Sequence, residues 1–323
     1  MSTASTSIVS VLMCVYNDPR FVGHAIESIL TQSFEDFEFV IVDDGSTDTT
    51  PSILEKYAFQ DSRIRIFRQP NAGTTAAANY GLSLVRGKYV ARIDSDDISY
   101  PHRLATEVQF LEQNPDVALV GGGAHIIDFE GRIVGLRNIV TSRPERTLWH
   151  RCIYQQSDVM FRTEIVSKLG GYREKFRNAQ DYDLWLRISE TAQIAKLDVI
   201  LGQWRLNGGG YTLSRRIEQK NEVCLIKRFA YRRRKSNPDQ YENYHPPALP
   251  KHRISMDRLD YDLTVVAVLI QSMRLREARN RLLSVLQERR SKKIYVLLAI
   301  TYTPSWSIFL VFKVRDIYLN LFA

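Results

Sequence analysis

Short apolar runs alternate with helical patterns through the first hundred residues of this chain. The apolar runs are IVSVLMCV, FEFVIVDD, IRIFRQ and KYVARIDSDD, and each is rich in Val, Ile or both. Helical spacing fills the intervals, from about Phe21 to Gln32, from about Thr50 to Tyr57 and through AAANYGLSLV. This rhythm predicts an α/β fold with a mostly parallel sheet, because each crossover helix covers one face of the sheet.

The pattern changes after the fourth apolar run. A helical pattern, PHRLATEVQFLEQ, precedes VALVGGGAHIIDFEGRIVG, which predicts strands around a turn, and AQDYDLWLRISETA predicts a further helix. From about Ser214 the chain becomes basic and helical: residues 1–214 carry 22 Lys and Arg against 26 Asp and Glu, whereas residues 215–323 carry 22 against 10. We therefore predict one domain over 1–214 and a basic helical tail over 215–323.

The composition narrows the class of protein. With 44% hydrophobic and 25% charged residues among 323, the chain is typical of ordinary globular proteins. Its three cysteines, Cys14, Cys152 and Cys224, are far apart, which favours neither a disulfide framework nor a zinc site. The run from Ile8 to Val15 lacks a basic flank, so we interpret it as a buried strand rather than a signal peptide and expect a cytoplasmic protein.

Two acidic clusters, VDDGSTD and RIDSDD, stand at the ends of predicted strands, which is where ligands of parallel sheets bind. The second places Asp94, Asp96 and Asp97 within four positions. Neighbouring carboxylates raise one another's pKa, so such a cluster needs a cation or hydrogen-bond donors. A divalent metal is one answer. The alternative is a solvated turn in which Asp97 or Ser99 caps the helix that Pro101 begins.

The first cluster allows a similar pair of interpretations. Asp44 stands where it could accept a hydrogen bond from the N–H of a nucleobase, and Gly45 lets the chain turn sharply there. The alternative is a turn with a helix cap from Ser46, Thr47 or Asp48.

A third acidic pair, Asp181 and Asp183, opens a predicted helix, where carboxylates gain from the helix dipole. Two residues apart on a helix, they point in different directions. We expect one to face a cleft while the other caps the helix or is solvated, and Asp181 is the candidate base.

In combination these motifs are far more specific than any one of them. Taken in order, the segments VSVLMCVYN, VDDGSTD, NAGTTAAANYGL, GKYVARIDSDD, GGYREKFRNAQDYDLWLRI and QWRLN closely resemble family 2 inverting glycosyltransferases with the GT-A fold. The likeness spans roughly residues 8 to 214. It implies a mixed, mostly parallel sheet flanked by helices, with a nucleotide-sugar-binding half at about 1–100 and an acceptor half at 101–214. The basic helical tail predicted above would be a C-terminal helical extension of this fold.

The resemblance also implies roles for single residues. Tyr16 would stack on the nucleotide base and Asp44 would bind uracil. Asp94 and Asp96 would engage the ribose and a divalent metal, Mn²⁺ or Mg²⁺, on the diphosphate. Asp181 would be the general base. The nucleotide-sugar-binding residues implied in this way are Val15, Tyr16, Asn17, Asp44, Asn71, Gly73, Asn79, Asp94, Ser95 and Arg205.

Two positions depart from the family pattern. Gln180 stands where a glutamate is common, and Asn207 stands where relatives often have a histidine near the diphosphate. Arg205 remains in the matching place, where it could pair with a phosphate oxygen.

The expected activity is transfer of a single sugar, most simply from a UDP-linked donor, to a hydroxyl of a glycan or lipid-linked acceptor in surface polysaccharide biosynthesis. Processive relatives carry a fuller Gln-x-x-Arg-Trp motif and transmembrane helices. The alternatives are a phosphotransferase or phosphatase that uses the DSDD loop, and a glycan-binding protein that kept the fold and lost catalysis. A nicotinamide enzyme is disfavoured because no GxGxxG follows the first predicted strand.

The basic tail suggests a partner surface. RRRK at 232–235 and the apolar segment 294–312, which contains Tyr295, Tyr302 and Trp306 between basic flanks, have the character of interfacial helices at an anionic membrane. This favours a peripheral position on the inner face of the plasma membrane, with no nucleic acid partner. The alternatives for 294–312 are packing onto the domain as ordinary core and spanning the bilayer.

Overall fold

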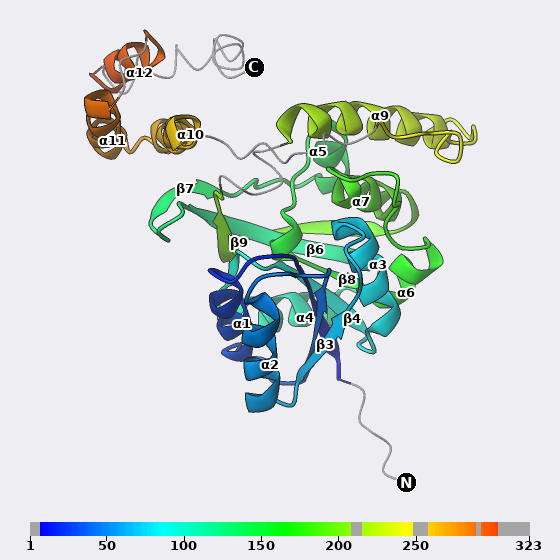
Figure 1. The fold of residues 1–323 in the computed structure, drawn as a ribbon. Helices are drawn as coiled ribbons and strands as arrows, with labels where there is room; N and C mark the ends of the chain where they lie inside the picture. The colour runs from blue at the N-terminus through cyan, green and yellow to red at the C-terminus, as the bar shows by residue number, and fades with distance from the viewer. Residues whose placement is uncertain (1–6, 208–214, 248–257, 289–291, 303–323) are drawn as a thin grey trace. The chain divides into compact units, whose positions relative to one another are not determined.

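The computed structural model describes residues 7–207, 215–247, 258–288 and 292–302. The chain divides into two compact units, traced in Figure 1. The first contains 1–125, 137–205 and 215–252, and the second contains 126–136, 206–214 and 253–323. Each unit is described by itself below.

A mixed sheet organises the fold. The strands are β1 (Val9–Val15), β2 (Phe37–Asp43), β3 (Ile64–Arg68), β4 (Tyr89–Asp94), β5 (Ile98–Ser99), β6 (Val117–Ile127), β7 (Ile133–Arg137), β8 (Val159–Arg162) and β9 (Gln193–Arg205). Their order is β3-β2-β1-β4-β8-β6-β9-β5, with β7 paired to β6. Neighbours among β1 to β4 run parallel, whereas β8 is antiparallel to both β4 and β6. The predicted α/β fold is confirmed.

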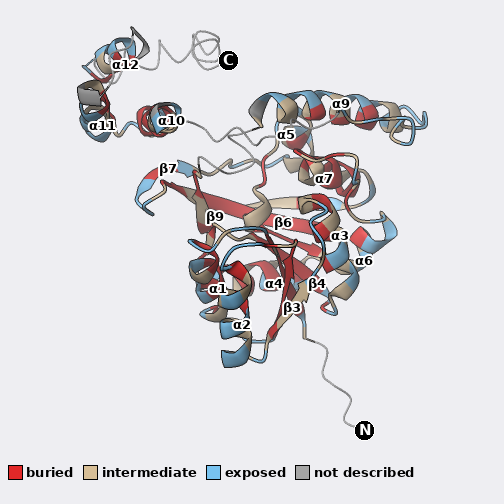
Figure 2. Ribbon diagram, in the orientation of Figure 1, coloured by how far each residue is buried: buried red, intermediate tan, exposed pale blue. Residues whose placement is uncertain are grey.

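Helices cover both faces of the sheet in the first unit. They are α1 (Val22–Leu30), α2 (Thr50–Gln60), α3 (Thr74–Leu84), α4 (Arg103–Gln113), α5 (Pro144–His150), α6 (Thr163–Lys168), α7 (Gln180–Thr191) and α9 (Arg216–Arg234), with the short 3-10 helix η1 (Gln156–Asp158). Successive residues of β1 alternate between two cores: Val11 and Met13 pack with α1, α2 and α4, whereas Leu12 packs with α3, α7 and α9. Burial on both faces explains the unbroken apolar runs, visible as the red strands of Figure 2.

The strand register brings the acidic clusters to one edge of the sheet. Val15 of β1 is paired with Asp43 of β2, and Cys14 is paired with Asp94 of β4. Because these three strands are parallel, the segments that follow them leave the sheet at the same end. The two acidic clusters therefore lie beside the carboxyl end of β1.

Helix α9 belongs to the first unit, where it packs against α7. Its basic end is tied down by ion pairs: Arg233 contacts Glu190 at 2.6 Å and Asp239 at 2.8 Å. The first unit thus includes residues 215–247 of the predicted tail. The predicted boundary itself, at residue 214, lies outside the described residues and stays a prediction.

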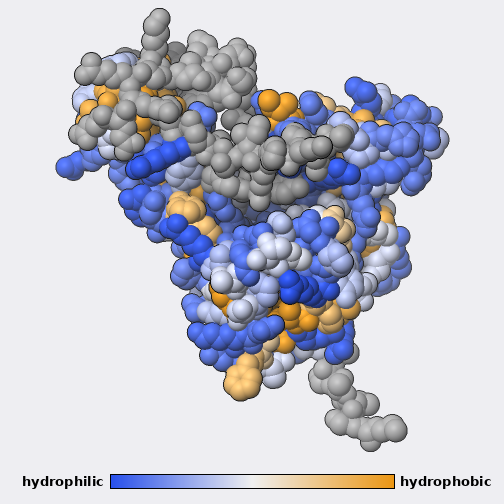
Figure 3. All heavy atoms as spheres, in the orientation of Figure 1, coloured by the Kyte–Doolittle hydropathy of each residue, from blue (hydrophilic) through white to orange (hydrophobic). Residues whose placement is uncertain are grey.

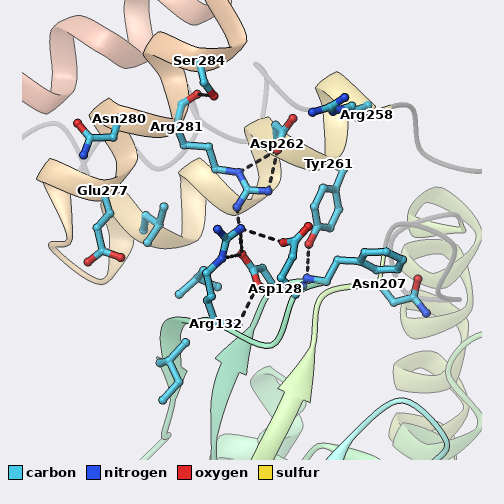
Figure 4. A pocket seen from close by; sticks show the side chains of 15 residues that line it. Asp128, Arg132, Asn207, Arg258, Tyr261, Asp262, Glu277, Asn280, Arg281 and Ser284 are labelled. Atoms are coloured by element: carbon cyan, nitrogen blue, oxygen red, sulfur yellow. Dashed lines mark hydrogen bonds and ion pairs between the residues drawn. The ribbon is translucent and has the colours of Figure 1, made fainter. Parts of the chain in front are cut away.

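The second unit combines the hairpin around Gly131 with the helices α10 (Arg258–Gln271), α11 (Leu275–Glu288) and α12 (Lys292–Tyr302). Asp128 is the centre of its polar network: its carboxylate contacts Arg132 at 2.8 Å and Arg281 at 3.1 Å, and Arg281 also contacts Asp262 at 2.7 Å (Figure 4). The side chain of Asp128 is only 1% exposed, so the network connects the hairpin to α10 and α11, and removal of one partner would leave a buried charge unpaired.

Candidate active site

Asp44 follows β2 and holds the loop that leads into α3. Its Oδ1 accepts hydrogen bonds from Gln69 Nε2 at 2.7 Å and from the Ala72 amide at 3.0 Å, and its Oδ2 accepts from the Gly73 amide at 2.9 Å. The turn needs glycine beside it, because a Cβ on Gly45, at φ +78°, would lie 2.7 Å from the Asn71 amide. A buried carboxylate with three donors is held rigidly.

The end of β1 contributes the adjacent wall. Val15 is buried, and Tyr16 directly after it is 43% exposed. Asn17, at φ +51°, accepts from the Thr47 amide at 2.8 Å and donates to the Thr47 hydroxyl, so it ties β1 to the loop after β2. The ring of Tyr16 therefore offers exposed aromatic surface at this edge.

Asp94 ends β4 beside η1. The side-chain amide of Gln156 donates to Asp94 Oδ1 at 3.0 Å. The backbone amide of Asp94 donates to the Ser157 hydroxyl at 2.9 Å. The Asp94 side chain is nevertheless 42% exposed, so it can reach a ligand. Next to it, the Ser95 hydroxyl donates to Asp18 at 2.7 Å. Burial raises the pKa of Asp18, which the sequence motifs did not single out.

The proposed cap by Asp97 or Ser99 is wrong. Helix α4 begins at Arg103 with His102 as its N-cap, and Asp97 instead accepts from the Arg205 amide at 2.8 Å and the Ser157 hydroxyl at 2.5 Å. Asp97 is 2% exposed; burial, then the charges of Asp96 and Asp94, raise its pKa well above the ordinary value. This buried carboxyl therefore joins β4 to η1 and to the end of β9.

Arg205 is the last residue of β9 and lies at the same edge. It is 6% exposed, its Nε donates to the carbonyl of Asp96 at 2.9 Å, and its guanidinium lies 4.3 Å from the ring centre of Phe21. The charge of Arg205 also acts on Asp18. Arg205 thus holds the backbone of the turn that contains Asp94, Asp96 and Asp97.

Asp181 stands in the first turn of α7 and accepts from the Tyr182 amide at 2.8 Å. Burial and, to a smaller extent, the charge of Asp94 raise its pKa to about 6. Residues far apart in the sequence, on β4 and α7, therefore lie close enough to interact electrostatically. A carboxylate with such a pKa is suited to accept a proton near neutral pH.

Asp183 points elsewhere, as its spacing predicts, but it is neither a cap nor solvated. Its side chain is fully buried and pairs with Arg187 at 2.8 Å and Arg173 at 3.7 Å. The expectation failed because α9 and the residues after it cover this face of α7, so the carboxylate needs cationic partners there. Gln180, which replaces the usual glutamate, has a buried Oε1 with no hydrogen-bond partner in the described part of the chain.

Asn79 is engaged within the protein. On α3, its Nδ2 donates to the Tyr172 carbonyl at 2.9 Å and its Oδ1 accepts from the Tyr172 amide at 2.8 Å. Asn71 is exposed and Gly73 has φ +93° at the start of α3. These three residues thus lie along one loop and helix, with Asn79 holding the GGYRE segment.

The donor chemistry at β4 fits a divalent metal that arrives with a phosphate. Asp94 is partly exposed and Asp96, two residues later, is partly exposed as well. One or two carboxylates plus substrate phosphates are the usual ligands of Mg²⁺. Within the described ranges, no group of three or more His, Cys, Asp or Glu side chains could hold a metal by itself.

A cavity of about 780 Å³ lies in the second unit. None of the proposed nucleotide-sugar-binding, metal-binding or catalytic residues lines it, but Asn207, which the family resemblance places near the diphosphate, does. Figure 4 shows its wall of polar side chains from the hairpin, α10 and α11, among them Tyr261, Asn280 and Ser284. Its central charges are already paired with one another through Asp128 and Arg281.

Sequence comparison places the chain among known proteins. The profile of the family described as glycosyl transferase family 2 matches residues 10–173. The EpsE protein of Bacillus subtilis (strain 168) is 38% identical over 187 residues, which cover 56% of this chain and 66% of EpsE.

Solved structures share the fold. TarS 1–349 of S. aureus, in complex with UDP-GlcNAc, superposes with a TM-score of 0.57 at 18% identity, over 81% of this chain and 71% of that one. The mannosyltransferase PcManGT from Pyrobaculum calidifontis, in complex with GDP-Man and Mn²⁺, gives 0.55 at 19% identity, over 92% and 79%. With the profile match over half of its length and the GT-A architecture around its acidic rim, the chain belongs to glycosyl transferase family 2.

Proposed function

We propose that the protein is a metal-dependent inverting glycosyltransferase that moves one sugar from a UDP-linked donor to an acceptor hydroxyl. The observation that carries the proposal is the partly exposed Asp94 at the carboxyl end of β4, on the edge where both acidic clusters lie, together with Asp181 in the first turn of α7, whose pKa the charge of Asp94 helps to raise. The first carboxylate is exposed enough to meet a ligand, and the second has the pKa of a base that works near neutral pH.

In this proposal the donor lies along the rim formed by β1, β2 and β4. Tyr16 stacks on the base, and Asp44 accepts from the uracil N–H. A carboxylate offers about four lone-pair sites, and the three donors already on Asp44 leave one for the base. Val15, Asn17, Asn71, Gly73, Asn79 and Ser95 shape the loops around this nucleotide. Arg205 is proposed to contribute positive charge beside the diphosphate.

Asp94 and Asp96 would hold Mn²⁺ or Mg²⁺, which offsets the charge that develops on the leaving diphosphate. Asp181 takes the proton of the acceptor hydroxyl while that oxygen forms its bond to the anomeric carbon. The bond from this carbon to the phosphate oxygen breaks on the opposite face, and UDP leaves. A single displacement inverts the anomeric centre.

The nucleotide is tested by calorimetry. UDP, GDP and dTDP are titrated into the protein with Mn²⁺ and again with a chelator. TarS was solved with UDP-GlcNAc and PcManGT with GDP-Man, so both nucleotides belong in the screen. We expect UDP to bind in the presence of Mn²⁺ and to lose affinity with the chelator. Failure of all three nucleotides to bind under either condition contradicts the proposal.

The acceptor is proposed to be a glycan or lipid-linked saccharide of surface polysaccharide, reached from an anionic membrane surface. In the described residues no helix has the length and apolar character to cross a membrane. Helices α11 and α12 expose Leu283, Tyr295, Val296 and Tyr302, and Figure 3 shows hydrophobic surface among the C-terminal helices. Trp306 and the rest of the predicted segment to residue 312 lie outside the described residues.

Liposome sedimentation tests this membrane association. The full chain is expected to sediment with vesicles that contain anionic lipid, and a variant without residues 290–323 is expected to sediment less. Equal sedimentation of the two proteins removes the membrane from the proposal and leaves the transferase activity untouched.

A further inference from the structure

The N-terminus of the helix that carries Asp181 is held by one carboxylate from α9. Glu222 accepts from three consecutive backbone amides, those of Arg177, Asn178 and Ala179, at 3.1, 2.7 and 3.0 Å. It also accepts from the side-chain amide of Asn178 at 2.7 Å. Glu222 is 7% exposed. The three amides lie just before Gln180, the first residue of α7, and the last of them, that of Ala179, is two residues before Asp181.

A second contact from the same face of α9 completes the clamp. Gln219, one turn earlier, donates to the carbonyl of Asn178 at 2.9 Å. The backbone of Asn178 is thereby held at both its amide and its carbonyl. On the other side, Thr75 of α3 donates to the carbonyl of Phe176 at 2.9 Å.

Ala179 is the N-cap of α7, so its amide belongs to the helix N-terminus, where amides lack intrahelical partners and are normally satisfied by a side chain from the adjoining sequence. The amides of Arg177 and Asn178 belong to the segment that leads into the helix. Here the carboxylate comes from a residue more than forty positions later in the chain. Buried charge-assisted hydrogen bonds are short and strong, and the negative charge is favourable at the positive end of the helix dipole. The start of α7 is thus fixed by tertiary structure.

We infer that Glu222 is a positioning residue for the transfer reaction: through residues 177–179 it holds α7 so that Asp181 stays within reach of the acceptor hydroxyl. The inference rests on the proposed function, because it gives Asp181 the role of base. It also makes α9 part of the catalytic unit. A displacement of about 1 Å in a catalytic group can cost on the order of 10²-fold in rate.

The test uses the full chain with Glu222→Gln, which keeps the size of the side chain but replaces an accepting oxygen by a donor that faces backbone N–H groups. Glu218→Gln is the matched control, since Glu218 lies one turn earlier on α9 and accepts none of these amides. UDP release from a panel of UDP-sugars with Mn²⁺ gives turnover, calorimetry with UDP gives affinity, and hydrogen–deuterium exchange reports on residues 177–181.

We expect Glu222→Gln to lower kcat by about tenfold or more, to leave the Kd for UDP within about twofold and to speed amide exchange at 177–181. The control should match the unaltered protein in all three. Turnover of Glu222→Gln equal to that of Glu218→Gln overturns the inference, and so does a loss of UDP affinity as large as the loss of turnover.

A second variant covers the case in which Glu222→Gln does not fold. Glu222→Asp keeps the charge and draws the carboxylate back by one methylene, so kcat is again expected to fall while UDP affinity holds; unchanged kcat overturns the inference. If the unaltered protein releases no UDP from any of a panel of UDP-sugars, the proposed function fails instead. The exchange measurement separates that failure from a failure of the clamp.

Discussion

Asp44, which follows β2, and Asp181, in the first turn of α7, are two buried or partly buried carboxylates with different surroundings. Asp44 is 3% exposed and has three donors from its own chain, so the fold itself uses it. Asp181 has the Tyr182 amide as its donor, and burial raises its pKa to about 6. A carboxylate with several donors stabilises a loop, whereas burial with fewer donors raises the pKa of a carboxylate and suits it to act as a base.

The largest effect is expected on turnover. Asp181→Asn should lower kcat by on the order of 10² or more, because general base catalysis is typically worth that much. UDP affinity should be nearly unchanged. Release of UDP from UDP-sugars and calorimetry with UDP measure the two quantities, and unchanged turnover removes Asp181 from the mechanism.

The pH dependence follows from the raised pKa of Asp181. The base of the free enzyme is ionised above about pH 6, so kcat/KM should be constant at higher pH and fall about tenfold per unit below it. A pH profile of kcat/KM measures this. The residual activity of Asp181→Asn should lack the acidic limb, and a limb of the same shape in that variant assigns it to another group.

A smaller effect is expected at the metal. Asp96→Asn should reduce the gain in UDP affinity that Mn²⁺ provides by about tenfold, because loss of one of two carboxylate ligands weakens the binding of the cation. Calorimetry with and without Mn²⁺ measures it. Asp116→Asn, at an exposed position outside the rim, is the control. Metal-independent UDP binding in the unaltered protein would contradict the role given to Asp96.

Substitution of the two carboxylates by Asn should change the free energy of unfolding in opposite directions. Asp44→Asn should lower the free energy of unfolding by about 1–3 kcal/mol, the usual cost of leaving buried donors without an acceptor. Chemical denaturation at pH 7.5 measures this. A variant as stable as the unaltered protein would mean that the loop after residue 69 does not depend on Asp44.

Asp181→Asn should instead raise the free energy of unfolding at pH 7.5 by on the order of 1 kcal/mol, because the charged form of Asp181 is disfavoured in the folded state. The shift of about two pKa units sets an upper bound of roughly 3 kcal/mol, and partial exposure of the residue reduces it. The gain should be complete above about pH 6 and vanish below about pH 4. A gain that persists at pH 4 would assign it to another cause.

Some features of the candidate site could be predicted from the sequence, whereas others depend on residues that are distant in the chain. The strands, the acidic ends of β2 and β4, and the helix that opens near Asp181 were predictable, because apolar periodicity and turn residues are local signals. Gln156 and Ser157, which contact Asp94 and Asp97, follow them by about sixty residues and carry no motif. Asp183 was misjudged for the same reason, since its partner Arg173 and the cover from α9 depend on packing.

The sequence alone determined that this chain builds a sheet with carboxylates at one edge, since alternation of apolar runs and polar turns leaves few other ways to bury its core. Only the tertiary structure decided which carboxylates are free to react. Parallel register placed Asp94 beside β1, packing of α7 brought Asp181 within reach of its charge, and Glu222 of α9 fixed that helix. Burial and hydrogen-bond partners set the properties of an ionisable group, and both come from residues distant in the chain.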